Sequence, residues 1–207
     1  PIFQPATAMR HFILPAAFLF VAAPLSAQLH AVTCCNKGPV IVYDIAFPNA
    51  AHHEAEVKAT FTALPRNLPR CPGGVGLRTA MTMLKSGWVI VGSAPSTDGT
   101  TNTRGAGCLV VLDSQGNLAD VIANDSINMP WGNMATIDHG TTATIFVSNA
   151  GFGIGSPDGK PPVVNQATVL RIELSIPDGK PPVVVRQTVI GSGFGAQADK
   201  DVFLVGP

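Results

Sequence analysis

Short apolar runs separated by clusters of Gly, Pro, Asn and Asp recur along most of this chain. Many of these runs are rich in Val, Ile and Thr, and such runs, bounded by turn residues, are typical of β-strands. Beyond Ala27, no long segment keeps a clean helical period, and the best helical candidate is the short segment 52–59. The pattern therefore predicts an all-β fold with strands at 40–46, 79–84, 87–94, 108–113, 117–123, 134–138, 144–149, 168–174 and 183–190.

Two parts of the chain repeat one order of strands and turns. GWVIVGSA at 87–94 aligns with ATIFVSNA at 143–150, and CLVVLDS at 108–114 aligns with TVLRIELS at 168–175 when position 108 is set against 168. Each unit reads strand, tight turn, strand, long loop, strand, tight turn, strand. Four antiparallel strands repeated every ~40–60 residues are typical of β-propeller blades, and a β-sandwich with chance similarity is the alternative.

The second unit resembles a blade of the NHL-repeat β-propellers. Its segment PWGNMATIDHGTTATIFVSNAG at 130–151 has the rhythm of that family: a Pro/Gly start, a short inner strand, a turn, and a strand that ends in a small or polar residue. The family often has Asp where this chain has Asn149, and Ser93 stands at the equivalent place in the first unit. The group includes streptogramin lyases and is architecturally close to the gluconolactonase-like propellers.

The resemblance covers about residues 75–207 and implies a partial β-propeller. It consists of about two four-stranded antiparallel blades, at 75–123 and 131–190, together with an N-terminal strand, and 201–207 reads as the start of a third blade. Propellers close with about four to eight blades. We therefore expect the ring not to be closed in this chain, which is then an N-terminal fragment of a longer propeller.

Residues 1–27 include the layout of a secretory signal peptide. Met9, Arg10 and His11 give a short positive start, residues 12–23 form an apolar run, and PLSA offers a small residue for cleavage before Gln28. A helix over this apolar run would span about 18 Å, which is too short for a membrane core of about 30 Å. The remaining assignments are an upstream extension at 1–8, the signal peptide at 9–27, and an N-terminal strand and irregular segment at 28–74.

Export and composition narrow the range of partners. We expect a secreted, periplasmic or cell-surface protein without a membrane span in the mature chain. Lys+Arg and Asp+Glu are 13 each, so no strong field favours nucleic acid or an anionic membrane. In an oxidising compartment the cysteines pair. We favour a bridge from Cys34 or Cys35, taken as Cys35, to Cys71, which would tie the N-terminal strand to the body.

Four connecting segments should share one face of such a fold: 95–107, 124–132, 151–166 and 191–207. Long loops on one face of a rigid scaffold are where binding residues gather, and these loops are longer than connectivity requires. An ordinary polar rim is the alternative reading. The candidate ligand-binding residues are Asp98, Asn102, Arg104, Asp125, Trp131, Asn133 and Asn149.

Other motifs carry less chemistry. The cluster HHEAE at 52–56 lacks the second His of HExxH, because position 57 is Val. GFGIG and GSGFG do not have the spacing of phosphate loops. The octapeptide PDGKPPVV occurs at 157–164 and 177–184, and the spacing of the two copies is too short to match the blade repeat. We interpret the second copy as a turn in which Gly179 tolerates a positive φ, and the first as the segment that leads into a strand.

The sequence therefore predicts an exported NHL-type β-propeller that binds a protein or small-molecule ligand through long loops on one face, without a cofactor. A metal-dependent hydrolase or lyase, gluconolactonase-like or streptogramin-lyase-like, is the alternative. It would use a divalent metal such as Ca²⁺ and a site completed by further blades. A structural repeat protein without a small ligand is the third hypothesis. None of the motifs specifies a reaction.

Overall fold

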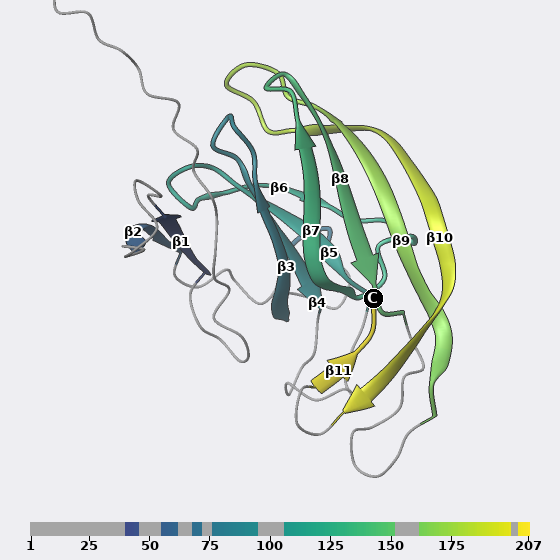
Figure 1. Cartoon of the computed structure of the whole chain (residues 1–207). Helices are drawn as coiled ribbons and strands as arrows, with labels where there is room; N and C mark the ends of the chain where they lie inside the picture. Colours follow the sequence, from purple (N-terminus) through teal and green to yellow (C-terminus); the bar gives the residue numbers. More distant parts are fainter. Residues whose placement is uncertain are drawn as a thin grey trace, which may run out of the picture.

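The computed structural model describes residues 40–45, 55–61, 68–71, 76–94, 106–151, 162–199 and 203–207. All regular structure in these residues is β-strand (Figure 1). Among them, no helix is long and apolar enough to cross a membrane. The strands are β1 (Val40–Ile45), β2 (Ala55–Phe61), β3 (Leu77–Met83), β4 (Val89–Ala94), β5 (Cys108–Leu112), β6 (Leu118–Ile122), β7 (Pro130–Asp138), β8 (Thr142–Asn149), β9 (Val164–Ser175), β10 (Val183–Asp199) and β11 (Phe203–Val205).

β1 and β2 form a two-stranded antiparallel sheet of their own. The best helical candidate in the sequence, the segment 52–59, is not a helix where it is described, because β2 occupies Ala55–Phe61. Its sequence AEVKATF alternates apolar and polar residues, which is the period of a strand and not of a helix. The N-terminal strand predicted at 40–46 is present as β1.

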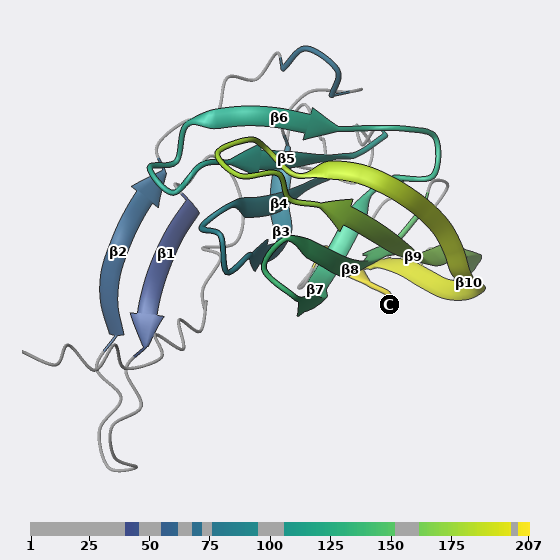
Figure 2. The same ribbon diagram turned by 90° about the horizontal axis from the view of Figure 1, so that it is seen from above.

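Two larger antiparallel sheets follow along the chain (Figures 1 and 2). Sheet A has the strand order β3-β4-β5-β6. Sheet B has the order β7-β8-β9-β10, with β11 paired to the last residues of β10. The predicted fold class is confirmed, since the described chain is all-β and contains a four-stranded and then a five-stranded antiparallel sheet, consistent with a partial propeller. A third blade starting at 201–207 stays a prediction.

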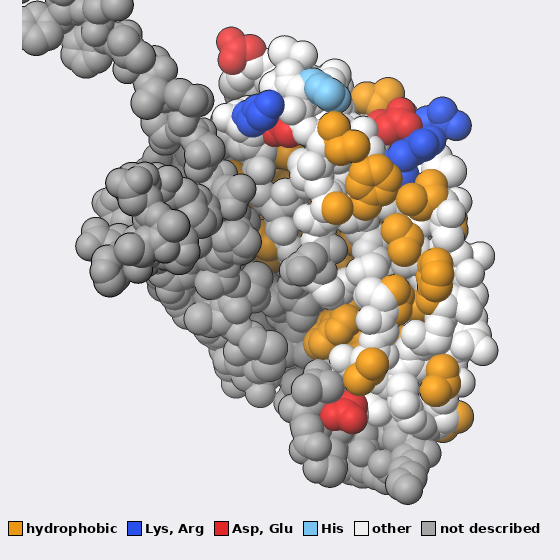
Figure 3. All heavy atoms as spheres, viewed as in Figure 1, with side chains coloured by type: hydrophobic (Ala, Val, Ile, Leu, Met, Phe, Trp, Pro, Cys, Tyr) orange, Lys and Arg blue, Asp and Glu red, His pale blue; other side chains and the backbone are white. Residues whose placement is uncertain are grey.

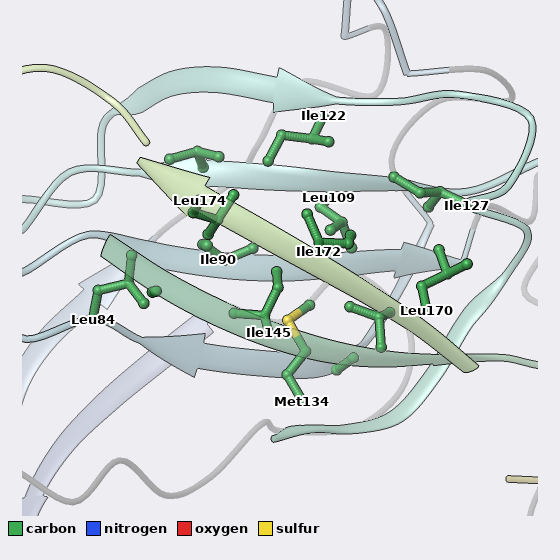
Figure 4. Close-up of a cluster of buried hydrophobic side chains, with 14 of the residues drawn as sticks. Leu84, Ile90, Leu109, Ile122, Ile127, Met134, Ile145, Leu170, Ile172 and Leu174 are labelled. Carbon is green, nitrogen blue, oxygen red and sulfur yellow. The ribbon is translucent and has the colours of Figure 1, made fainter. Parts of the chain in front are cut away.

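The two sheets pack against each other around the main hydrophobic cluster (Figure 4). Ile90 and Leu109 of sheet A lie there with Ile145, Leu170 and Ile172 of sheet B, and all five are fully buried. Burial of one such side chain contributes about 1.5–3 kcal/mol, so this cluster is the main source of stability. β4 and β5 are buried along their whole length, because a second cluster covers the other face of sheet A.

The cross-strand registers show that the two sheets are copies of one pattern. In sheet A, Ile90 pairs with Val111, and in sheet B, Phe146 pairs with Arg171. The sequence alignment of the two units sets Ile90 against Phe146 and Val111 against Arg171, so aligned residues pair in the same way. Paired residues of an antiparallel sheet point to the same face, so faces can be compared between the sheets. The structure therefore supports a true repeat over chance similarity.

We name the two faces of each sheet from this equivalence. The forward face carries, in sheet A, Thr82, Leu84, Ile90, Leu109 and Val111 and, at the equivalent positions of sheet B, Ala135, Ile137, Phe146, Val169 and Arg171. The rear face of sheet B carries Ile145, Val147, Leu170 and Ile172. The forward face of sheet A packs on the rear face of sheet B, so the two sheets are stacked in the same direction.

Polar contacts join both edges of this stack. At one edge, Thr82 Oγ1 of β3 and Thr136 Oγ1 of β7 are 2.6 Å apart. At the other edge, the side-chain amides of Asn124 and Gln187 exchange two hydrogen bonds of 3.0 and 2.9 Å. Directional bonds of this kind fix the relative position of the sheets, which apolar packing alone specifies less sharply.

A disulfide between Cys71 and Cys108 corrects the predicted pairing of Cys35 with Cys71. Cys108 begins β5 and is fully buried, and Cys71 lies in the cluster that covers the rear face of sheet A. The bridge therefore fastens the segment 68–71 to the centre of sheet A. Cys34 and Cys35 lie outside the described residues. Sequence spacing alone left the partner open, because pairing depends on which strand ends the fold brings together.

The second copy of PDGKPPVV forms the turn between β9 and β10. The Lys180 amide donates to the Pro177 carbonyl at 3.1 Å, and Gly179 has a φ of 63°. The turn prediction is confirmed for this copy. Most of the first copy lies outside the described residues, but β9 begins at Val164, its last residue, as expected for a segment that leads into a strand.

Reducing the Cys71–Cys108 bond should lower the free energy of unfolding by about 3–4 kcal/mol, because the unfolded chain has more conformational entropy without the cross-link than with it. Urea denaturation of the full chain with and without a reductant measures the change. The double variant Cys71→Ala/Cys108→Ala is the matched control and should match the reduced protein without reductant. Identical midpoints for the oxidised and reduced protein would show that the bridge does not stabilise the fold.

Replacing Gly179 by Val should destabilise the protein by about 1–2 kcal/mol, because a β-branched residue resists the left-handed backbone region. A Cβ at Gly179 would meet no atom within 4 Å, so the cost is conformational and not steric crowding. Gly179→Asn is the control, since Asn tolerates this region. Equal midpoints for the Val and Asn variants in urea would rule out this explanation.

Candidate functional site

Residues in or directly beside the four predicted loop segments meet in a third hydrophobic cluster at one end of the two sheets, which we call the loop end. The prediction of a loop at 191–207 is wrong, because β10 continues to Asp199 and β11 occupies Phe203–Val205. Alanines predominate in it, and small side chains allow neighbouring backbones to approach closely. The four segments therefore leave the sheets next to one another. The cluster contains Ala94 before the first segment, Met129 and Trp131 in the second, Ala150 and Ala167 around the third, and Ala196, Ala198 and Leu204 in the fourth.

Gly107 makes the closest approach between two of these segments. A Cβ at this position would lie 2.1 Å from Pro130 Cδ and 2.8 Å from the Ser93 carbonyl oxygen. Only glycine leaves room for the start of β7 beside the start of β5. The first long loop is thus held against the second at its described end.

Asn149 is fully buried and uses its side chain inside the protein. Its Oδ1 accepts a hydrogen bond from the backbone N–H of Asn128 at 3.2 Å. Its Nδ2 donates to the backbone carbonyl of Ser126 at 3.0 Å and to Thr168 Oγ1 at 3.1 Å. Both amide protons are therefore taken. The side chain fastens the segment before β7 to the end of β8 and the start of β9, which is a structural role and not the ligand contact that we expected.

Ser93 occupies the equivalent position at the end of β4 and makes an equivalent bond. It is fully buried, and its Oγ accepts from the Gly76 amide at 3.0 Å. Gly76 immediately precedes the first strand of sheet A, as Asn128 lies just before the first strand of sheet B. In both sheets, a polar side chain at the end of the second strand therefore binds the backbone that leads into the first strand.

Trp131 and Asp125 are the predicted site residues that the structure places on the second segment. Trp131 is half-buried against the alanine-rich cluster, and its carbonyl accepts a hydrogen bond from Ser148 Oγ. Asp125 is exposed in a turn closed by the Ile127 amide, which donates to the Asn124 carbonyl at 3.0 Å. The two residues therefore lie at the loop end, one packed and one in solvent.

The remaining predicted residues are described less fully. Asp98, Asn102 and Arg104 lie outside the described residues, and Asn133 is described only by its position in β7. Asn128 was not singled out from the sequence, yet its Oδ1 is buried without a hydrogen-bond partner. The surrounding sequence, NDSINM, is rich in side-chain amides. It contains no pattern that would identify Asn128 as the residue whose side-chain oxygen is unpaired.

The electrostatics of the loop end are mild. Within the described ranges, no group of three or more His, Cys, Asp or Glu side chains is placed to hold a metal ion. The side chain of Asn117, with backbone amides, donates to Asp113 and lowers the pKa of that carboxyl, but Asp113 lies in the β5–β6 turn at the other end of sheet A. The described part of the loop end therefore suits neutral hydrogen bonding and apolar contact.

Comparison with known proteins does not add a family. No protein-family model, no curated protein and no solved structure matches this chain. The site is therefore argued from its own geometry.

Replacing Asn149 by Ala should lower the free energy of unfolding by about 2–3 kcal/mol, because it removes three hydrogen bonds and leaves buried groups without partners. Ser93→Ala removes one bond of the same type and should cost about 1 kcal/mol. Asp125→Ala is the exposed control and should stay within about 0.5 kcal/mol of the wild type. Urea denaturation of the three variants tests the order, and an Asn149 effect no larger than the Asp125 effect would refute this role.

Proposed function

We propose that this protein is an exported, NHL-type propeller scaffold that binds a protein or small-molecule partner through its loop end. The observation that carries the proposal is an asymmetry in the connections. The connections from β4 to β5, over 95–107, and from β8 to β9, over 150–163, are much longer than the β3–β4 turn at 84–88 and the β7–β8 turn at 139–141, which lie at the other end. Hairpin connections need only about 2–5 residues.

The alanine-rich cluster supports the same proposal. It packs residues of the second and fourth segments against residues that directly flank the first and third, so connections from both sheets start beside one another. Binding residues that start from fixed positions lose less entropy when a partner binds.

Two further observations support export and the NHL type. The disulfide between Cys71 and Cys108 agrees with an oxidising compartment, which the signal-peptide layout of residues 9–27 also indicates. The repeated registers of the two sheets, and the repeated bonds of Ser93 and Asn149, agree with a family built from blades.

The test is a binding screen of the mature chain on arrays of peptides and of glycans, followed by calorimetry on each ligand retained. A loop-end variant, Asp98→Ala/Arg104→Ala, should weaken binding at least about tenfold, since it removes charged groups from the first long loop. The variant Asp178→Ala/Lys180→Ala, in the β9–β10 turn at the other end, is the matched control and should bind as the wild type does.

Two results would contradict the proposal. Retention of no ligand by the wild type is one, and equal loss in the loop-end and control variants is the other. Thermal unfolding with and without CaCl₂ covers the enzyme alternative. A calcium-dependent rise in Tm that is lost in Asp98→Ala would favour the metal-dependent hydrolase or lyase over the scaffold.

A further inference from the structure

The turn between β9 and β10 contains an Asp-Gly bond whose neighbouring polar groups are not engaged. Gly179 has a φ of 63°, whereas Asp178 does not have a positive φ, so the turn closed by Lys180 and Pro177 is of type II. The amide between the two central residues takes no part in closing such a turn. Among the described residues, neither the Asp178 carboxylate nor the Gly179 amide has a hydrogen-bond partner.

Little surrounds this bond. Asp178, Gly179 and Lys180 are all exposed, and a Cβ at Gly179 would meet no atom within 4 Å. Figure 3 shows charged side chains in solvent at the end of the sheets where the short turns lie, at the top of the view. Glycine also gives the backbone more rotational freedom than any other residue. The Asp178 carboxyl carbon is therefore able to approach the Gly179 nitrogen without displacing a neighbour.

Asp113, in the turn between β5 and β6, is held by hydrogen bonds. Its Oδ1 accepts from the Gln115 and Asn117 amides at 2.9 and 2.8 Å, and its Oδ2 accepts from Asn117 Nδ2 at 2.9 Å. The Asn117 side chain, with these backbone amides, also lowers the pKa of the Asp113 carboxyl. Asp113 is thus kept charged and fixed in one orientation.

Asp138, beside the turn between β7 and β8, is held in the same way. Its Oδ1 accepts from the Gly140 amide at 2.7 Å, and its Oδ2 accepts from the Lys85 amide at 2.6 Å. The amide that follows it, that of His139, donates to the Thr142 carbonyl at 2.9 Å. Both the carboxylate and the next amide are therefore engaged.

Asp125, in the exposed turn after β6, lacks one of the two requirements. The amide that follows it, that of Ser126, donates to Asn124 Oδ1 at 3.0 Å. Among the aspartates in or beside the described turns, Asp178 alone combines an unbonded carboxylate with an unbonded amide on the next residue. That next residue is also the glycine that crowds the reaction least.

We propose that Asp178 is a site of spontaneous isoaspartate formation. The Gly179 nitrogen attacks Asp178 Cγ, a bond forms between these two atoms, and the amide hydrogen leaves with a carboxyl oxygen and its proton as water. A second water then opens the five-membered ring. Where it cleaves the bond from the nitrogen to the main-chain carbonyl carbon of Asp178, the chain stays linked through Cγ. One water leaves and one enters, so the mass is unchanged and water is the only co-reactant.

The rearrangement changes the turn and not the sheet. It adds Asp178 Cβ to the main chain, so the turn gains one carbon atom and the 3.1 Å bond from Lys180 to Pro177 should be lost. The pairing of β9 with β10 begins beyond the turn, at Ser175 and Val183, and should persist. The site lies at the opposite end from the loop end and does not depend on the proposed binding function.

The test is incubation of the folded full chain near neutral pH, followed by peptide mapping at several times. Trypsin should release residues 172–186, in which Asp178 is the only aspartate. This peptide should separate into two chromatographic forms of equal mass, and the new form should resist cleavage by a protease that cuts before aspartate. Asp178→Glu keeps the charge and should abolish the new form, because a glutamate would have to close a six-membered ring.

Ser114→Gly is the matched control, because it places a second Asp-Gly bond in the held turn at Asp113. Ser114 is exposed, and a urea midpoint checks that the variant folds. In the folded variant, isoaspartate at Asp113 should form at least about tenfold more slowly than at Asp178, since hydrogen bonds of the Asp113 carboxylate must break first. In urea the two rates should agree within about twofold, because neither turn persists in the unfolded chain.

Three outcomes would overturn the proposal. The first is a folded chain that forms no isoaspartate at Asp178 under conditions in which the urea-unfolded chain does so, since the turn would then protect the bond. The second is an equal rate at Asp113 and Asp178 in the folded Ser114→Gly variant, which would assign the reaction to the dipeptide alone. The third is an unchanged second form of the peptide in Asp178→Glu.

Discussion

The structure depends on one contact, the packing of the forward face of sheet A on the rear face of sheet B. Fully buried Ile and Leu side chains from both sheets form this layer. It removes one face of each sheet from solvent, which neither sheet can do by itself. The disulfide and the second cluster complete sheet A from its other side. Among the described residues, sheet A is thereby an interior layer and sheet B an outer one.

This difference explains how two copies of one pattern have unlike surfaces. Val111 and Arg171 are equivalent by register, but the first lies in an interior layer and the second on a half-exposed face. The residue type at each of these positions follows whether its sheet is buried, and not its place in the repeat.

The polar residues at the ends of the second strands connect the fold to the loop end. Ser93 and Asn149 each bind the backbone just before the first strand of their own sheet. At the end where the long connections emerge, the second strand of each sheet is thus bonded to the segment that leads into the first strand of the same sheet. Asn149, a binding candidate from its position, holds these segments together instead, and exposed side chains near it, such as Asp125, remain open to a partner.

Local pattern in the sequence determined the strands, their antiparallel order and the repeat of the two units, because side-chain alternation and turn residues act over a few neighbours. The same alternation is present in AEVKATF and predicts β2, although the overlapping segment 52–59 is the best helical candidate in the sequence. The partner of Cys71, the buried role of Asn149 and the exposure of Ile137 were decided only by tertiary structure. Each depends on which segments, distant along the chain, the stacked sheets bring together, and no local period carries that information.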